Sequence, residues 1–195
     1  MKIEIRSNTA VIEGYVNAVG RDSRILMSPE KGKFVEQVLP KTFQKAIERG
    51  KEIELRLNHR KTLGSTKSNL KLYEDNIGLY ARAEVSDEET VAKARNKELR
   101  GWSFGFVKMP NGDQWEDAQD GILRRKLTDI ELREVSILDK TPAYIGTSIE
   151  TREEDTFVVE FRSEESEAEV NDHPPITPDF ALQEKEIDLL ELKKY

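Results

Sequence analysis

The alternation of hydrophobic and polar residues predicts a chain built mostly from short strands. Residues 53–59 alternate strictly, so Ile53, Leu55 and Leu57 share one face of a strand and His59 continues this inward face. Two apolar runs on either side of a polar turn predict a hairpin over residues 70–85. Apolar segments of strand length predict further strands at residues 3–5, 11–19, 102–109, 122–127 and 130–138.

Two helices are expected between these strands. Residues 40–49 begin with a proline, which suits the first turn of a helix, and Gly50 follows as a C-terminal stop. Ser86 with Glu89 three residues later forms a capping box, which predicts a helix over residues 87–98. The pattern favours a mainly β, α+β fold. We expect a closed or nearly closed antiparallel β-barrel with peripheral helices.

The composition changes near residue 150, where acidic residues crowd the chain and prolines follow at 174, 175 and 178. Such a stretch buries too little apolar surface to offset the entropy lost on ordering. We therefore expect a folded domain over residues 1–150 and an acidic, disordered tail over residues 151–195. Residues 180–195 have the pattern of a short amphipathic helix, either a frayed end or a segment that docks on a partner.

Charge and residue usage exclude several classes of protein. The net charge of −7 argues against general nucleic-acid binding, which needs cationic side chains to neutralise phosphates. The 195 residues include no cysteine and only two histidines, so disulfides, thiol catalysis, cysteine-ligated metals and a zinc site are not expected. No apolar run approaches the ~20 residues of a membrane span, and no signal peptide is evident. We expect a soluble protein of a reducing cytoplasm.

A serine on an apolar strand is the first candidate for chemistry. Within residues 101–106, strand alternation places the side chains of Trp102, Phe104 and Phe106 on one face, toward the core. Ser103 then lies on the other face between two glycines. Glycine at those positions leaves room for another backbone, such as that of an extended peptide substrate.

A serine hydroxyl needs an adjacent base to act as a nucleophile, and His59 is the histidine available in the folded region. Glu134 lies in the otherwise apolar segment 132–138 and needs a partner there, which makes it a candidate to orient the imidazole. The pattern alone leaves other interpretations open. Ser103 can be a hydrogen-bonded structural serine and His59 a core histidine, and Glu134 can pair with an arginine, namely Arg133, Arg124 or Arg125.

Six segments, taken in order along residues 10–150, carry a resemblance to a known family. They are Gly14-Tyr15, Phe34-Val35-Glu36 leading to Leu39-Pro40-Lys41-Thr42-Phe43, Leu57-Asn58-His59 with Leu63-Gly64, Asp75-Asn76-Ile77-Gly78-Leu79, Trp102-Ser103-Phe104-Gly105-Phe106, and Leu132-Arg133-Glu134-Val135-Ser136 followed by Thr141-Pro142-Ala143-Tyr144. In these segments the chain resembles the prohead maturation proteases of tailed bacteriophages. Those serine peptidases trim capsid and scaffold segments during head assembly.

The resemblance implies a role for each candidate residue. Ser103 matches the nucleophile of its motif, His59 the general base, and Glu134 the acidic position of the closing motif, to which we assign the orienting role. The family is similar in fold to the herpesvirus assemblin proteases, which have a barrel with surrounding helices and use a second histidine as third member. The folded region has no second histidine, which favours Glu134. Backbone N–H groups, or by analogy an arginine of Arg124-Arg125, are the candidates for oxyanion stabilisation.

The function that the resemblance implies is a serine endopeptidase that needs no cofactor. Its substrates would be the major capsid protein and scaffold segments, inside the assembling procapsid in the host cytoplasm, and it would also process itself. The acidic tail is then an inert extension, a segment that targets the protease to capsid protein, or a propeptide cleaved between about residues 150 and 178. Assemblin-type relatives dimerise, so a homo-oligomer is expected by the same analogy.

Two other functions remain as alternatives. One is a non-enzymatic assembly factor of the same fold, which scaffolds capsid protein and needs none of Ser103, His59 and Glu134. The other is a hydrolase of small esters. The absence of a Gly-x-Ser-x-Gly segment speaks against the common esterase fold.

Overall fold

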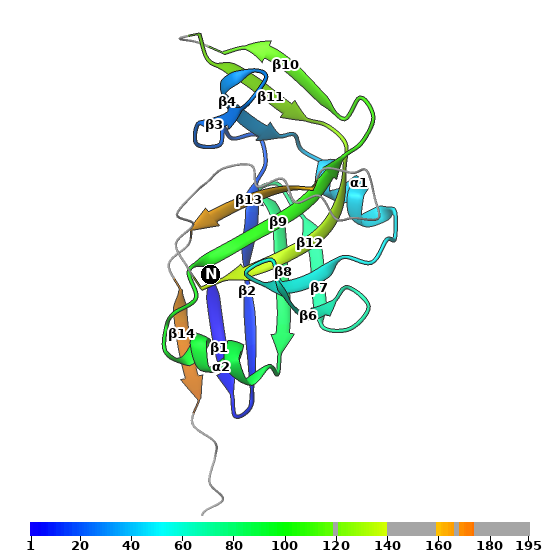
Figure 1. The fold of residues 1–195 in the computed structure, drawn as a ribbon. Coiled ribbons are helices and arrows are strands. Elements are labelled where there is room, and N and C mark those ends of the chain that lie inside the picture. The colour runs from blue at the N-terminus through cyan, green and yellow to red at the C-terminus, as the bar shows by residue number, and fades with distance from the viewer. Residues whose placement is uncertain (119–120, 140–158, 166–167, 174–195) are drawn as a thin grey trace, which may run out of the picture.

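The computed structural model describes residues 1–118, 121–139, 159–165 and 168–173, which form three sheets and two short helices (Figure 1). One five-stranded sheet has the order β14 (Glu169–His173), β1 (Lys2–Arg6), β2 (Thr9–Ala18), β8 (Gly78–Val85) and β7 (Leu70–Glu74). The other has the order β13 (Glu160–Glu165), β9 (Gly101–Lys108), β12 (Ile130–Leu138), β5 (Glu54–Leu57) and β6 (Lys61–Ser65). The four-stranded sheet, at the top of Figure 1, has the order β10 (Asp113–Asp117), β11 (Leu123–Leu127), β4 (Gly32–Val38) and β3 (Leu26–Ser28).

The mainly β character and the two helices are confirmed, but the expected closed antiparallel barrel is not found among the described strands. Three neighbouring pairs are parallel, namely β1 with β14, β4 with β11, and β5 with β12. The sheets separate where only two residues lie between β11 and β12. There the backbone N–H groups of Thr128 and Asp129 both donate to the Gly112 carbonyl oxygen (2.8 and 3.1 Å). These bonds hold the bend that carries the chain from one sheet into the other.

The core lies between the two five-stranded sheets. Side chains from both join one buried cluster, with Ile12 from one sheet and Trp102 and Phe104 from the other. The sheets approach closely at Gly14, where an added Cβ atom would lie 3.4 Å from the Trp102 indole nitrogen. Helix α1 (Thr42–Glu48) adds Phe43, whose ring packs edge-on against Phe104 with centroids 5.2 Å apart. This packing fixes the aromatic face of β9, and with it the direction of the opposite face.

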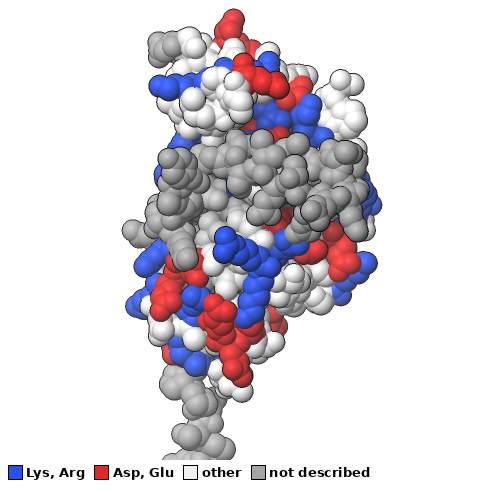
Figure 2. Space-filling model, in the orientation of Figure 1, with Lys and Arg blue, Asp and Glu red and all other residues white. Residues whose placement is uncertain are grey.

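Both predicted helices form, with shorter bounds and one different cap. Helix α2 (Glu88–Arg95) begins at Asp87, whose carboxylate accepts a hydrogen bond from the Thr90 backbone N–H (3.0 Å). The capping box predicted from Ser86 is therefore wrong by one residue. Figure 2 shows basic and acidic side chains side by side over the lower part of the face. Lys93 of α2 forms an ion pair with Asp139 at 2.9 Å.

Two strands come from the segment for which we predicted disorder. β13 pairs antiparallel with β9, and β14 pairs parallel with β1, so the prediction is wrong for residues 159–165 and 168–173. The segment has too little apolar content to predict a strand. β13 nevertheless forms because partners elsewhere in the fold neutralise its charges, as Glu36 does for Arg162. The amphipathic helix predicted over residues 180–195, and the Thr141–Tyr144 part of the closing motif, lie outside the described residues.

Candidate active site

The strand β9 presents Ser103 as its sequence predicts. Trp102 and Phe104 are fully buried on the core face, and Ser103 points to the opposite face. Ser103 is flanked on that face by Ser136 of β12 and Ser163 of β13, each in direct register with it. The serine itself is 0% exposed.

A β-bulge determines which way Glu134 points. Leu132 is opposite Phe106 and Glu134 is opposite Gly105, so Arg133 is the extra residue in β12. Simple alternation would place Leu132 and Glu134 on one face. The bulge instead leaves Leu132 in the core and turns Glu134 to the face that carries Ser103, while Arg133 is exposed.

His59 lies on that same face, and not on the inward face that alternation predicted. β5 ends at Leu57, and the next two residues, Asn58 and His59, have φ values of 52° and 63° in the left-handed region. The Arg60 N–H donates to the Leu57 carbonyl oxygen (3.0 Å), which closes a tight turn. The turn is also bound to β12, because the His59 backbone N–H donates to the Ser136 hydroxyl (3.3 Å). The chain reverses direction at this turn, which places the imidazole of His59 beside Glu134.

The side chains of His59 and Glu134 are in direct contact. Nδ1 of His59 lies 2.5 Å from Oε1 of Glu134, and the Ser136 hydroxyl donates to the same oxygen (3.0 Å). Oε2 of Glu134 forms an ion pair with Nη1 of Arg56 at 3.0 Å. An ionised carboxylate only accepts hydrogen bonds, so this network assigns the proton to Nδ1 of the neutral imidazole.

The electrostatics of the pair favour a charged Glu134. Burial of the side chain, which is 5% exposed, would by itself raise the pKa of the carboxyl. The hydrogen bond from His59, the charge that its ring carries when protonated and the charge of Arg56 act in the other direction and lower that pKa below its ordinary value. Glu134 is thus an anion placed to hold the imidazole and to stabilise its protonated form.

Gly105 provides the space in which this pair sits. A Cβ atom there would lie 2.8 Å from Cγ of Glu134 and 2.8 Å from Cε1 of Phe161, so both side chains pass directly over the glycine. The His59 ring packs edge-on against Phe161, with centroids 4.5 Å apart. The imidazole therefore lies near β9, two residues along from Ser103. The sequence predicted that another backbone would approach this glycine, whereas two side chains make the close approach in the structure.

The Ser103 hydroxyl is hydrogen-bonded to β13. It donates to the backbone carbonyl oxygen of Arg162 (2.6 Å) and accepts from the hydroxyl of Ser163 (3.1 Å). Within the described ranges no hydrogen bond joins Ser103 to His59. The structure thus brings His59 and Glu134 into contact and places Ser103 on the same sheet face, with its hydroxyl directed at a neighbouring strand.

The arginine partners that we considered for Glu134 are engaged elsewhere. Arg133 pairs with Glu131 (2.7 Å). Arg124 and Arg125 lie on β11 in the four-stranded sheet, and each forms ion pairs with acidic side chains there, which leaves the proposed oxyanion role of this pair without support. The sequence analysis missed Arg56 as the partner. Arg56 stands between Leu55 and Leu57 in an alternating strand, and this position predicts that its side chain lies on the face opposite the core.

The other classes of site are not evident in the described residues. No group of three or more histidine, aspartate or glutamate side chains there could hold a metal ion. Among the same residues, none of the helices is both long and apolar enough to cross a membrane. A serine hydroxyl on the same sheet face as a histidine–carboxylate pair is the set of groups with which serine hydrolases work.

Comparison with known proteins gives the family. The family model of the caudovirus prohead serine proteases matches residues 1–160, and the chain therefore belongs to this family. The resemblance found in the sequence is confirmed. The protein is accordingly a serine protease of the class that acts in capsid maturation of tailed bacteriophages. Searches of the curated proteins and of the solved structures give no match, so the assemblin-like relation stays a prediction.

Proposed function

We propose that the protein is a serine endopeptidase in which Ser103 is the nucleophile, His59 the general base and Glu134 the residue that orients the base. The observation that carries this proposal is the 2.5 Å contact between His59 Nδ1 and Glu134 Oε1, on the sheet face that also carries Ser103. With Nδ1 bound to the carboxylate, Nε2 is the ring nitrogen available to take a proton.

The reaction follows from these positions. The Ser103 hydroxyl turns from its acceptor on β13 toward the imidazole, and its oxygen attacks the carbonyl carbon of an extended peptide while His59 Nε2 takes the proton. The negative charge of Glu134 stabilises the imidazolium that forms. His59 then protonates the leaving amine, and water resolves the acyl-enzyme by the same steps in reverse order. Backbone N–H groups are the default donors for the oxyanion.

Arg56 and Ser136 support the base without touching the substrate. Arg56 binds Glu134 Oε2, and Ser136 binds both Oε1 of Glu134 and the backbone N–H of His59. Oε1 of the carboxylate therefore has Ser136 as a second partner beside the imidazole, and Oε2 has Arg56. We propose that these two residues are positioning residues for the His59–Glu134 pair.

We further propose that residues 1–150 form the protease domain, and that residues 151–195 act as a propeptide or targeting extension whose strands β13 and β14 pair with that domain. The substrates are the major capsid protein and scaffold segments, and the site of action is the assembling procapsid in the host cytoplasm. Homo-oligomerisation remains a prediction from the family.

The test is co-production of the full chain with the capsid protein of its phage, with cleavage followed by mass spectrometry. Ser103→Ala is expected to abolish cleavage. Ser65→Ala, which removes another buried serine hydroxyl on β6, is the matched control and is expected to retain it. Persistent cleavage by a folded Ser103→Ala protein would overturn the proposal and favour the alternative of a non-enzymatic assembly factor.

A further inference from the structure

A strand of the same chain binds the Ser103 hydroxyl. β13 lies on the edge of its sheet, antiparallel to β9, and the Arg162 carbonyl oxygen is 2.6 Å from Ser103 Oγ. The carbonyl carbon is one bond of about 1.23 Å from that oxygen. Adding an extended peptide to the edge of a sheet is a common way of recognising peptides. β13 thus occupies the place in which an extended substrate would pair with β9, and it places one peptide carbonyl at the serine.

The side chain of Arg162 enters a site that selects a guanidinium. Its Nε and Nη2 bind Oε1 and Oε2 of Glu36 at 2.6 and 2.9 Å, a two-point contact that fits the planar fork of arginine. Both side chains are almost fully buried, at 7% and 2% exposed. The guanidinium also lies over the ring of Phe106, 5.4 Å from its centroid. Glu36 and Phe106 belong to strands of the folded body, and Glu160 of β13 itself adds a further contact to Nη2 (2.7 Å).

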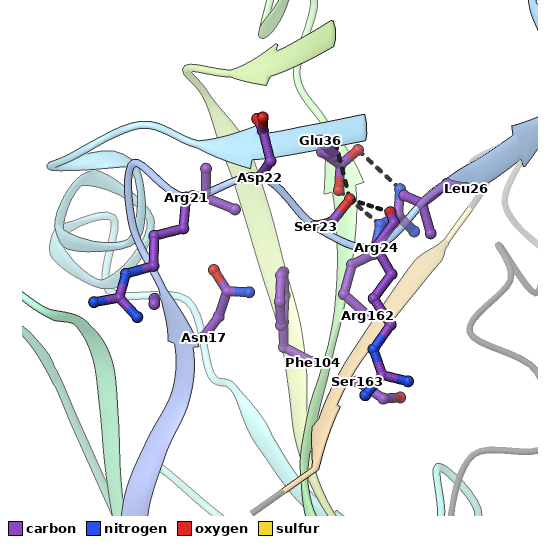
Figure 3. Close-up of a pocket in the computed structure, with 12 residues that line it drawn as sticks. Asn17, Arg21, Asp22, Ser23, Arg24, Leu26, Glu36, Phe104, Arg162 and Ser163 are labelled. Atoms are coloured by element: carbon purple, nitrogen blue, oxygen red, sulfur yellow. Dashed lines mark hydrogen bonds and ion pairs between the residues drawn. The ribbon is translucent and has the colours of Figure 1, made fainter. Parts of the chain in front are cut away.

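The guanidinium site opens beside a cavity of about 280 Å³. Glu36, Phe104, Arg162 and Ser163 all contribute to its lining, and Figure 3 shows Glu36 joined to Arg162 by hydrogen bonds at the wall of this cavity. When β13 leaves, the volume of the arginine side chain joins the cavity. The result is a slot with a buried carboxylate at its wall, adjacent to Ser103.

Resting on the proposed function, we infer that β13 marks how substrates bind, so that the protease cleaves after arginine, Glu36 selects that arginine, and its own Arg162–Ser163 bond is one substrate. In this step Ser103 Oγ bonds to the Arg162 carbonyl carbon and its proton passes to His59. The bond from that carbon to the Ser163 nitrogen breaks, and the nitrogen takes the proton. Water then hydrolyses the ester, which leaves a chain ending in the Arg162 carboxylate.

Self-cleavage at this bond also bears on access to the serine. Ser103 is fully buried and β13 fills the edge of β9, so a second peptide can pair with β9 there only after β13 leaves this edge. The cut leaves residues 160–162 attached to the body, so these residues must also withdraw before a substrate binds. A neutral residue in place of arginine would leave the buried Glu36 carboxylate without its two-point partner. A site built for a polar group rejects an analogue that lacks the group, and we expect a preference for arginine on the order of 10²-fold or more.

The first experiment follows the intact mass of the purified full chain during incubation. The wild-type chain is expected to shorten to residues 1–162, Ser103→Ala to stay at full length, Arg162→Lys to react more slowly and Arg162→Gln to remain uncut at this bond. Arg95→Gln is the matched control, because it removes an arginine ion pair to Asp172 in β14 and leaves β13 intact. It is expected to be cleaved as the wild type is.

The second experiment uses the self-processed enzyme and synthetic peptides with the sequence of residues 157–168, carrying arginine, lysine or glutamine at the position of Arg162. The ratio of kcat/KM for the arginine and glutamine peptides does not depend on the folded fraction. We expect this ratio to be large for the wild type and close to one for Glu36→Gln. If Glu36→Gln does not fold, the Arg162→Gln chain still tests the inference.

The outcomes separate the inference from the proposed function. Ser103-dependent capsid cleavage by a chain that never shortens at Arg162–Ser163 overturns the inference alone, as does an equal peptide ratio for the wild type and Glu36→Gln. Capsid cleavage by Ser103→Ala overturns the proposed function and the inference with it.

Discussion

Glu134 holds the imidazole of His59 at 2.5 Å although Glu134 lies on β12 and His59 in the turn after β5, far apart in sequence. The contact requires two irregularities in regular strands, the bulge at Arg133 and the left-handed turn after Leu57. Without the bulge, Glu134 would face the core, and without the turn, so would His59. Both departures serve one geometry, which is a frequent property of functional sites.

Replacing Glu134 by glutamine should lower proteolysis strongly. The amide keeps the size of the side chain but loses the charge that stabilises the imidazolium, and it can favour the wrong tautomer of His59. We expect kcat to fall by roughly 10²- to 10⁴-fold, measured as the initial rate of substrate cleavage. Glu131→Gln removes another buried carboxylate of the same strand, paired with Lys51, and serves as control. Equal rates for Glu134→Gln and wild type would contradict the orienting role.

Arg56 should act through Glu134, and its effect should appear in the pH profile. Arg56→Gln removes a charge that lowers the pKa of the Glu134 carboxyl. We therefore expect the acidic limb of the profile of kcat/KM to move to higher pH, with a smaller shift for Arg56→Lys. Arg133→Gln, the exposed arginine of the bulge, is the control and should leave the profile unchanged. A uniform loss of rate at every pH would indicate a structural role alone.

The stability of the fold should depend on pH through Glu134. The pKa of its carboxyl is lowered in the folded state, so the stabilisation is fully present above the unfolded value of about 4.3 and is lost as the pH falls through the folded value. The difference in Tm between wild type and Glu134→Gln should therefore be largest near neutral pH and shrink below pH ~4. Thermal melts followed by circular dichroism would measure it. A difference that grows on acidification would have the wrong sign.

Gly105→Ala should damage both the site and the fold. The new methyl group would overlap Glu134 and Phe161, each 2.8 Å away, so at least one of them must move. Overpacking of this kind costs about 1–3 kcal/mol. We expect a lower Tm and a rate of cleavage that falls by more than the loss of folded protein explains. A Gly105→Ala protein with the Tm and the cleavage rate of the wild type would show that the space over Gly105 is not needed.

The cap of α2 gives a test away from the site. Asp87→Ala removes the acceptor for the Thr90 N–H and is expected to cost about 1 kcal/mol. For a chain of this size that corresponds to a fall in Tm of roughly 2–4 °C. Ser86→Ala should have little effect, because the cap lies one residue later than the sequence pattern indicates. A larger fall in Tm for Ser86→Ala than for Asp87→Ala would support the capping box predicted from Ser86.

The sequence predicted those features that depend on local pattern. Alternation gave the strand that carries Ser103 and the face on which it lies, because the large aromatic residues beside it can be buried in only one direction. Alternation did not predict the face on which Glu134 lies, because the bulge adds one residue to the strand and composition does not reveal it. His59 was misplaced for a related reason, since Asn58 and His59 adopt left-handed conformations that the alternating pattern does not reveal.

The tail strands were missed because their stability is not local. β13 contains Glu160 and Arg162 among few apolar residues, and composition favours disorder for such a segment. Its charges are matched by Glu36 and Arg125, which lie in a different sheet. A pattern confined to the segment cannot show partners at such separations. The motif order along the chain did identify the family, because order and spacing are properties of the whole sequence.

The parallel pairing of β5 with β12 has a consequence for how the protein matures in time. Glu54 and Glu134 are in register, and the turn that carries His59 is bound to Ser136, so the site forms only when two distant parts of the chain meet. Contacts of this separation form slowly, because the entropy of closing a long loop is lost before the contacts contribute. The ribosome must also have synthesised Ser136 before the backbone N–H of His59 can donate to its hydroxyl. The newly made chain therefore passes through a period without proteolytic competence, and folding kinetics itself delays cleavage.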